Sequence, residues 1–174
     1  LIKGDSLSGL LPNVRMSPPG PVGSADNRVM TYAYRVCVTK NPNNQIPFTA
    51  PVDYDPITFE ALARLIEARV AITNSVPTLD RFLTIQGLPG NGKKYDLNNV
   101  RDLTVDYVGE NFDYTEASPS RRKEIMAKHE SFLRGMMYFL SHSSRVPESL
   151  RNEAASLGYC KDEYVDNSGF PYQL

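Results

Sequence analysis

Gly87, Gly92 and Lys93 have the spacing G-x-x-x-x-G-K, in which backbone N–H groups and a lysine could hold the phosphates of a nucleotide. A phosphate-binding loop also requires Ser or Thr directly after the lysine to hold Mg²⁺, and a helix N-terminus immediately behind the loop. Here Lys94 occupies the Ser/Thr position, and the following residues start no helix. The residues Gly90–Gly92 are instead typical of a tight turn with positive φ. We therefore predict a turn without a phosphate site.

No other self-contained catalytic or metal-binding pattern occurs in the sequence. The two histidines and the two cysteines lack the spacing of a zinc site, so we expect no metal. Neither a G-x-G-x-x-G dinucleotide fingerprint nor a G-x-S-x-G nucleophile elbow is present. A cluster of acidic side chains could supply the paired carboxylates of a glycosidase, but we interpret it as a solvated surface. This cluster consists of Asp102, Asp106, Glu110 and Asp113.

Cys37 and Cys160 lie far apart in the sequence and form neither a C-x-x-C redox motif nor a disulfide framework. Free cysteines are often buried and behave as small apolar side chains. We therefore predict two separate thiols, and a single long-range disulfide is the alternative.

The composition is that of a folded domain. Of the 174 residues, 41% are hydrophobic and 22% are charged, which is sufficient for a core. The 19 basic and 20 acidic residues give a net charge of −1 and no electrostatic reason to expect nucleic acid or a membrane as a partner. Since neither a membrane-spanning run nor a signal peptide is evident, we expect a soluble protein of unknown compartment. The first residue, Leu1, suggests a piece of a longer protein.

Strands are predicted from runs of β-branched and aromatic residues. Residues 1–28 form a Pro/Gly-rich lead-in that should be extended, because residues before proline avoid the helical region. The run Val29–Lys40 then predicts the clearest strand. The stretch DRFLTI before Gly87 indicates a second short strand, and Leu103–Val108 a third.

Apolar periodicity predicts two main helices, over about residues 56–72 and 119–142, and a short third helix that begins near Pro147. Together with the strands, these helices predict an α+β fold in which a short mixed or antiparallel sheet packs with helices amid much irregular loop. We treat residues 1–174 as a single domain or domain fragment, with the α+β part over 29–174. The expected core residues of the two main helices are Phe59, Leu62, Ile66, Phe132, Leu133 and Met136.

Polar residues that could line a pocket occur in two stretches. Tyr34 and Arg35 lie in the strand over 29–40, where Arg35 could hold a substrate anion or a developing oxyanion. The alternative for Arg35 is a side chain that faces solvent. In the stretch KKYDLNN, the Asp and Asn side chains suit a sugar or polyol, or else serve as turn and Asx caps. The candidates in this stretch are Lys94, Asp96, Asn98 and Asn99.

Three ordered stretches resemble one protein family. They are GPVGSADNRVMTYAYRVCVTK, GLPGNGKKYDLNN and RRKEIMAKHESFLRGMMYFLSHSSRVPESLRNEAASLGYCKDEYVDNSGFPYQL. They resemble the central part of bacterial FAD-dependent oxidoreductases, some of them xanthan-lyase-related, which show Y-x-Y-R-x-C-x-T, G-K-x-D-x-N-N and a closing N-x-G-x-P-x-Q-L. The resemblance covers most of residues 20–174. One extra glycine or lysine leaves open whether Lys93 or Lys94 takes the place of the family lysine.

The resemblance implies a bacterial flavoprotein in which hydride passes from a substrate to the flavin and FAD is bound by parts that precede and follow this segment. The chain itself is then the substrate-side segment, with no FAD expected on it and no catalytic residue assigned. Its partners would be the missing flavin-binding part of the same protein and a small-molecule substrate, a carbohydrate or polyol. The alternative is a stand-alone carbohydrate-binding or protein-interaction module without catalysis, for which 10 tyrosines and 7 phenylalanines could form a stacking surface.

Overall fold

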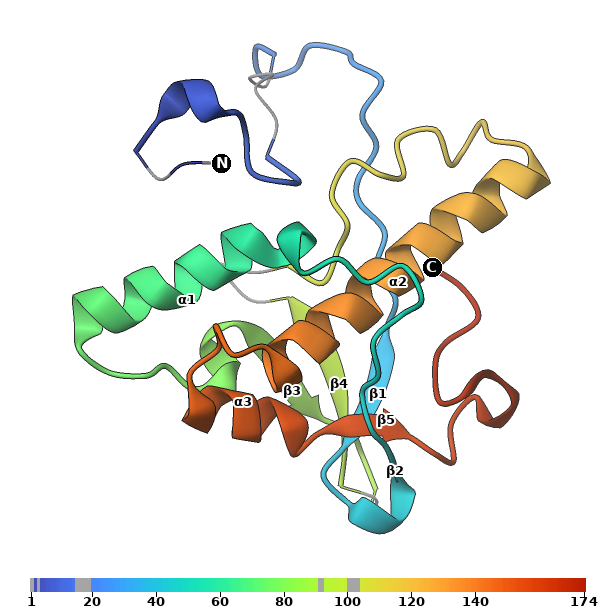
Figure 1. Cartoon of the computed structure of the whole chain (residues 1–174). Coiled ribbons are helices and arrows are strands. Elements are labelled where there is room, and N and C mark those ends of the chain that lie inside the picture. Colours follow the sequence, from blue (N-terminus) through green and yellow to red (C-terminus); the bar gives the residue numbers. More distant parts are fainter. Residues whose placement is uncertain (1, 3, 15–19, 91–92, 100–103) are drawn as a thin grey trace.

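Antiparallel strands form the centre of the molecule. The computed structural model describes residues 2, 4–14, 20–90, 93–99 and 104–174 (Figure 1). In these residues, five strands form one sheet in the order β2-β5-β1-β4-β3, and every neighbouring pair is antiparallel. The strands are β1 (Val36–Thr39), β2 (Gln45–Ile46), β3 (Leu83–Gly87), β4 (Lys94–Asn99) and β5 (Gly158–Cys160).

The described residues also form three α-helices, so the predicted α+β fold is confirmed. The helices are α1 (Glu60–Thr73), α2 (Pro119–His142) and α3 (Glu148–Ala155). A 3₁₀ turn over Pro56–Phe59 leads into α1, and the Asp55 carboxylate caps it by accepting a hydrogen bond from the Ile57 N–H. The Ser118 hydroxyl caps α2 by accepting from the Arg121 N–H. Both helix starts therefore follow from an oxygen-bearing cap residue placed directly before a proline.

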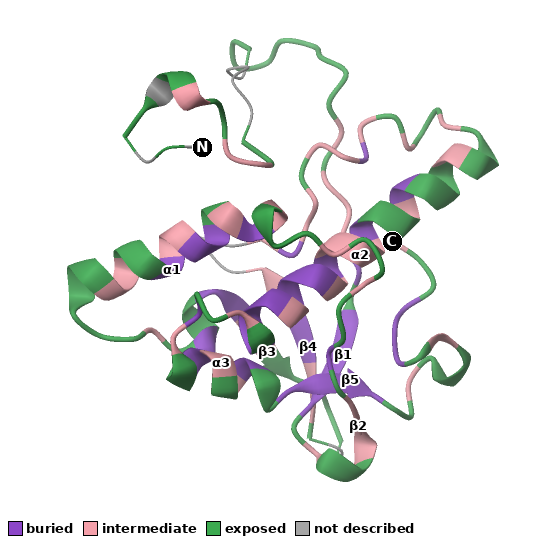
Figure 2. Ribbon diagram, viewed as in Figure 1, coloured by how far each residue is buried: buried purple, intermediate pink, exposed green. Residues whose placement is uncertain are grey.

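The helices cover one face of the sheet, and the core lies between the two layers. Figure 1 shows α2 crossing in front of the strands, with α1 and α3 beside it. Apolar side chains of the strands, such as Val36, Val38 and Leu97, join the same buried cluster as Leu133 and Leu140 of α2. Figure 2 shows the burial concentrated in the strands and in the sides of the helices that face them. Of the six expected core residues, only Phe132 is half-buried rather than buried.

The strand predicted over 29–40 is much shorter in the structure. Residues 29–35 are irregular, and only Val36–Thr39 pairs with neighbouring strands. The aromatic side chains of the irregular part pack on other elements: Tyr32 lies edge-on against Tyr114, and Tyr34 donates a hydrogen bond to the Met126 carbonyl of α2. Their aromatic character therefore reflects burial against α2 and its preceding loop rather than membership of a strand.

Two further expectations concern the loops. The predicted turn joins β3 to β4, and the Leu88 N–H donates to the Lys94 carbonyl across it at 2.9 Å. Gly90 has φ +110°, whereas residues 91–92 of the predicted turn lie outside the described residues. The strand expected over 103–108 is wrong for 104–108, which contain turns and bends, and Leu103 lies outside the described residues. Among the described helices, none is both long enough and apolar enough to cross a bilayer.

Candidate functional site

The sheet has a polar face opposite the helices. Directly paired residues share one face of a sheet, and successive residues alternate between faces. Since Val36 pairs with Leu97 on the core side, the pairs Cys37–Asp96 and Thr39–Lys94 must lie on the other side. We call the group Arg35, Cys37, Thr39, Lys94, Asp96 and Cys160 the polar face. It brings together three of the six candidate residues of the sequence, which are Arg35, Lys94 and Asp96.

Arg35 and Asp96 form a two-pronged ion pair across β1 and β4. Arg35 Nε donates to Asp96 Oδ1 at 3.1 Å, and Arg35 Nη2 donates to Oδ2 at 2.5 Å. The hydrogen bonds that the Arg35 guanidinium donates to Asp96 raise its pKa. The Arg35 side chain is nevertheless 67% exposed, whereas Asp96 is only 9% exposed. The pair therefore presents guanidinium donors to solvent from a fixed position.

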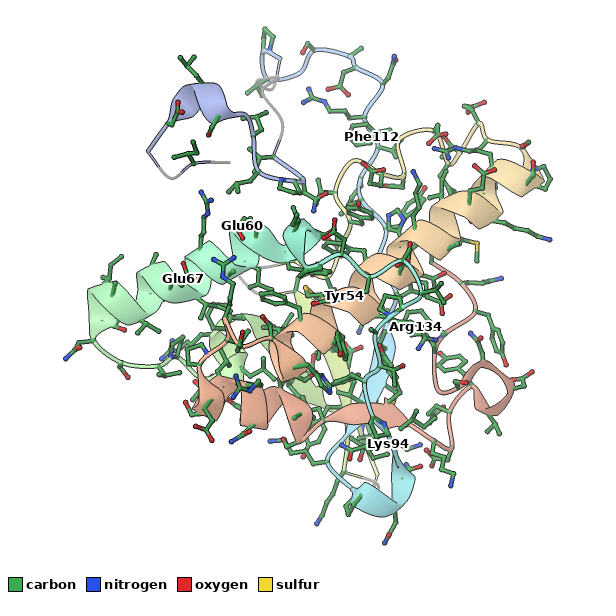
Figure 3. The ribbon with its side chains drawn as sticks, in the orientation of Figure 1. Tyr54, Glu60, Glu67, Lys94, Phe112 and Arg134 are labelled. Atoms are coloured by element: carbon green, nitrogen blue, oxygen red, sulfur yellow. The ribbon has the colours of Figure 1, made fainter. Side chains whose placement is uncertain are left out.

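Lys94 has a structural partner set. Its Nζ lies 2.6 Å from Glu163 Oε1 and 2.9 Å from Asp162 Oδ2, both in the segment that follows β5. These hydrogen bonds, Glu163 first, raise the pKa of Lys94. Asp162 also accepts from the Asn44 side chain at 2.7 Å, so the segment is tied down from two sides. Lys94 thus fixes the segment that follows β5 beside the polar face (Figure 3).

A pocket opens on the polar face, and we call it the sheet pocket. Its volume is about 250 Å³, and its lining includes Arg35, Cys37, Leu88, Asp96, Glu163 and Tyr164. Tyr164 adopts the left-handed conformation, with φ +45°, which is uncommon for a bulky residue. Tyr164 also contacts Tyr172 edge-on, at 5.6 Å between ring centroids. Strained backbone of this kind is enriched at binding sites, and here it lies at the wall of the pocket.

The other three candidate residues lie outside the sheet pocket. Tyr34 is buried in the core, and burial raises the pKa of its hydroxyl to about 12. Asn99 accepts a hydrogen bond from the Val105 N–H at 2.6 Å and donates to Asp106 at 2.8 Å. Asn98 accepts from the Asn99 N–H. Asn99 therefore fits the alternative of capping, because its side chain holds the chain that follows β4.

An aromatic groove lies on the helical layer, and sequence reasoning did not locate it. Two cavities of about 220 and 210 Å³ share Thr58, Phe59, Tyr107 and Phe132 as lining residues. The rings of Tyr107 and Phe132 stack in parallel at 4.3 Å. The number of tyrosines and phenylalanines indicated a stacking surface, but only the packing of the loop against α2 shows which rings form it.

The aromatic groove also carries polar groups at one end. The Ser131 hydroxyl donates to Asp53 Oδ1 at 2.5 Å, and both residues line the first cavity together with Tyr54 and Lys128. Flat aromatic faces beside a carboxylate and a hydroxyl suit a ligand with one apolar face and several hydroxyl groups. A sugar ring is such a ligand.

Cys37 and Cys160 are both buried, free thiols. The prediction of two thiols without a disulfide is confirmed, and the register of β1 and β5 brings the two thiols close together. The described residues contain no group of three or more His, Cys, Asp or Glu side chains that could hold a metal ion.

Comparisons with known proteins return no match. Neither the protein-family models, nor the curated proteins, nor the solved structures contain one that matches this chain. The sheet pocket and the aromatic groove are therefore the observations that bear on function.

Proposed function

We propose that the chain is the substrate-side segment of a bacterial FAD-dependent oxidoreductase whose substrate is a carbohydrate or polyol. The observation that supports this most is the sheet pocket, in which Arg35 and Asp96 come together from different motif stretches. An arginine fork beside a carboxylate offers hydrogen-bond donors and an acceptor within one small site. Hydroxyl groups both donate and accept, so a polyhydroxylated substrate fits this pair.

The third motif stretch lies against the first two. The ring of Phe170 in the closing stretch lies 4.8 Å from the ring of Tyr34, and Glu163 reaches Lys94. Arg134 of α2 lies over the Phe170 ring at 4.2 Å and so fixes the same segment (Figure 3). Stretches that are far apart in the sequence therefore form one structural unit around the sheet, as expected if they serve one site.

The described residues do not fit FAD by themselves. Dinucleotide sites of this class require a glycine-rich turn between a strand and a helix N-terminus, usually within a parallel sheet. All strand pairs described are antiparallel, and the hairpin between β3 and β4 leads into a strand rather than a helix. We therefore assign to this chain the binding and orientation of substrate, and to other parts of the protein the binding of FAD.

The test uses the complete reading frame that contains these 174 residues. The encoded protein should purify with bound flavin, and anaerobic addition of the right sugar or polyol should bleach the flavin absorbance. Arg35→Met should raise KM at least several-fold without loss of flavin, whereas Arg81→Met, at an exposed arginine of another element, should behave like the wild type. A reading frame without a flavin-binding unit, or a complete protein without flavin, would contradict the proposal.

The aromatic groove favours a second candidate function, a carbohydrate-binding module without catalysis. This function predicts that the 174-residue chain binds oligosaccharides by itself and that Tyr107→Ala weakens binding, because stacking on the Tyr107–Phe132 pair is lost. Arg35→Met would leave that binding unchanged. Glycan-array binding followed by calorimetry separates the two functions, since each depends on a different cavity.

A further inference from the structure

Cys37 and Cys160 face each other across two neighbouring strands. The antiparallel register pairs Val38 with Tyr159 and Thr39 with Gly158. One more step along the same register places Cys37 opposite Cys160. Cα atoms of directly opposite residues in antiparallel strands lie about 4.5–5.5 Å apart. This separation falls within the range of about 4.4–6.8 Å that a disulfide spans. The register therefore brings the two cysteines within the reach of a disulfide.

The two thiols have different environments. The hydrogen bond from Cys160 is the largest influence on Cys37 and lowers the pKa of its thiol, and the nearby Lys94 ammonium acts in the same direction. Burial and the charges of Glu163 and Asp162 act in the opposite direction. The pKa of the Cys160 thiol is raised by the same pairing and by burial. Of the two thiols, Cys37 therefore loses its proton more readily. The thiolate that forms is the nucleophile in disulfide exchange.

The two cysteines also differ in their exposure to the sheet pocket. Cys37 lines the sheet pocket and retains 9% of its exposed area, whereas Cys160 lies behind it with 0%. A small molecule in the pocket therefore meets Cys37 first. The more nucleophilic thiol and the more accessible thiol are the same residue.

We propose that Cys37 and Cys160 form a redox-active dithiol, in which Cys37 attacks a low-molecular-weight disulfide such as glutathione disulfide and Cys160 resolves the adduct. In the first step, the Cys37 thiolate forms a bond to one glutathione sulfur, and the other glutathione leaves as a thiolate that takes up a proton. In the second step, Cys160 loses its proton and attacks Cys37, and the second glutathione leaves. The protein loses two electrons and two protons, and one glutathione disulfide becomes two glutathione thiols.

The product would connect β1 to β5 at the wall of the sheet pocket. A disulfide between Cys37 and Cys160 closes a long loop that contains α1, β3, β4, α2 and α3. Crosslinks that close long loops restrict the unfolded chain most. Oxidation should therefore raise the melting temperature of the domain. This inference does not depend on the proposed oxidoreductase function.

The test is the mass of the folded chain after reaction with glutathione disulfide. The reduced 174-residue protein is incubated with the reagent, alkylated with iodoacetamide and measured intact. The wild type should lose the mass of two hydrogen atoms, resist alkylation and yield a crosslink between the tryptic peptides 36–40 and 152–161. If both thiols are still free after the incubation, so that urea unfolding in iodoacetamide alkylates each of them, the two buried thiols do not react with glutathione disulfide and the proposal is overturned.

Two single variants test the order of the steps. Cys160→Ser should stop at the first step and retain one glutathionyl group on Cys37, whereas Cys37→Ser should remain unmodified. The opposite pattern would contradict the assigned roles. If either variant melts below the assay temperature, Cys→Ala at the same position replaces it, and the wild-type crosslink remains decisive for the pairing itself.

A third experiment tests whether Lys94 activates Cys37, with the neighbouring Lys93 as the control. In the Cys160→Ser background, Lys94→Met should slow glutathionylation several-fold, because removal of the ammonium leaves Asp162 and Glu163 near the thiolate. Lys93→Met alters an exposed lysine one residue away and should leave the rate unchanged. Equal rates for both variants would show that Lys94 does not activate Cys37.

Discussion

Arg35 is the residue on which the proposed substrate site depends most. Its guanidinium is fixed by Asp96 through two hydrogen bonds, yet most of the side chain faces solvent. Both alternatives for this position, a pocket residue and a solvent-facing arginine, therefore describe part of what is observed. The Asp96 carboxylate is buried and has Arg35 as its ion-pair partner, so the position can contribute to folding as well as to binding.

The first prediction is that Arg35→Met lowers the free energy of unfolding by about 1–3 kcal/mol, because it leaves the buried Asp96 carboxylate without the two hydrogen bonds that Arg35 donates. Urea denaturation of the wild type and the variant measures the difference. An unchanged free energy of unfolding would contradict this prediction, and a kinetic defect in the variant could then be assigned to substrate binding alone.

His129 shows how burial determines the state of a titratable residue. Its Nδ1 lies 2.8 Å from the Ile125 carbonyl within α2, and its Nε2 is buried without a hydrogen-bond partner among the described residues. Tyr107 packs edge-on against the imidazole. Burial is the largest influence and lowers the pKa of His129 below its ordinary value, although Glu110 and Asp106 act in the opposite direction. His129 is therefore a buried core histidine.

The second prediction is a pH dependence of stability that originates at His129. Because the pKa is lower in the folded state, the unfolded chain binds more protons below the ordinary His pKa of about 6.5. Stability is therefore fully present above that pH and decreases as the pH falls toward the folded-state pKa. His129→Gln should reduce the loss of unfolding free energy between about pH 7 and pH 5. Denaturant titrations at the two pH values measure it, and parallel losses in both proteins would contradict it.

At the scale of elements, α2 is the principal support of the sheet. It begins at the proline that follows Ser118, and its inward side contributes Ile125, Leu133 and Leu140 to the core. Phe132 was expected in the same buried stripe, but it lies at the edge of that stripe and lines the aromatic groove. Helical periodicity predicts which side of a helix is buried. The shape of the elements that pack against the helix decides which residues at the edge of that side stay partly exposed.

The third prediction is that Leu133→Ala costs about 2–5 kcal/mol of unfolding free energy, since it removes buried methyl groups and leaves a cavity. The exposed Lys123 on the same helix is the control, and Lys123→Ala should change stability by less than about 0.5 kcal/mol. Thermal and urea unfolding of both variants provide the comparison. A loss at Leu133 as small as that at Lys123 would mean that the faces of α2 are wrongly assigned.

β5 shows an element that sequence patterns missed. The short helix α3 ends at Ala155, and Gly158 begins β5, a strand that was not predicted. A Cβ at this position would lie 2.4 Å from the Ile46 carbonyl oxygen, so β2 can approach only a glycine. A three-residue strand has no periodicity to detect, and its identity depends on partners that are distant in the sequence.

At the scale of the whole molecule, the chain forms one antiparallel sheet and one helical layer, with separate cavities on the two sides. The sheet pocket lies on the polar face, and the aromatic groove lies against α2. A segment that binds substrate beside a separate flavin-binding part needs an open polar surface of this kind. The helices pack on the opposite face of the sheet, and the residues that line the sheet pocket come from strands and loops.

The fourth prediction is that the 174-residue chain by itself binds no FAD and catalyses no oxidation. The described residues contain no glycine-rich turn that delivers a pyrophosphate to a helix N-terminus. The purified chain should be colourless, and its addition should leave the fluorescence of FAD unquenched. A yellow preparation with flavin absorbance would contradict this prediction and place the cofactor site within these residues.

The sequence by itself determined the features that depend on local interactions. Asp55 and Ser118 each precede a proline and mark a helix start, and the apolar spacing of Leu133 and Met136 marks the buried side of α2. Capping and periodicity act within a few residues, so they can be recognised without knowledge of the fold. The glycines near residue 90 indicated a turn for the same reason.

Only the tertiary structure decided which residues meet. It separates Tyr34 and Asn99 from Arg35, because Tyr34 is buried in the core and Asn99 pairs with the core residue Leu83 on the other side of the sheet. It also brings Cys37 next to Cys160, although more than half of the chain lies between them. Strand register depends on the packing of distant segments against a shared core, and the number of possible pairings grows with their separation. Local patterns therefore predicted the elements, and long-range pairing decided the site.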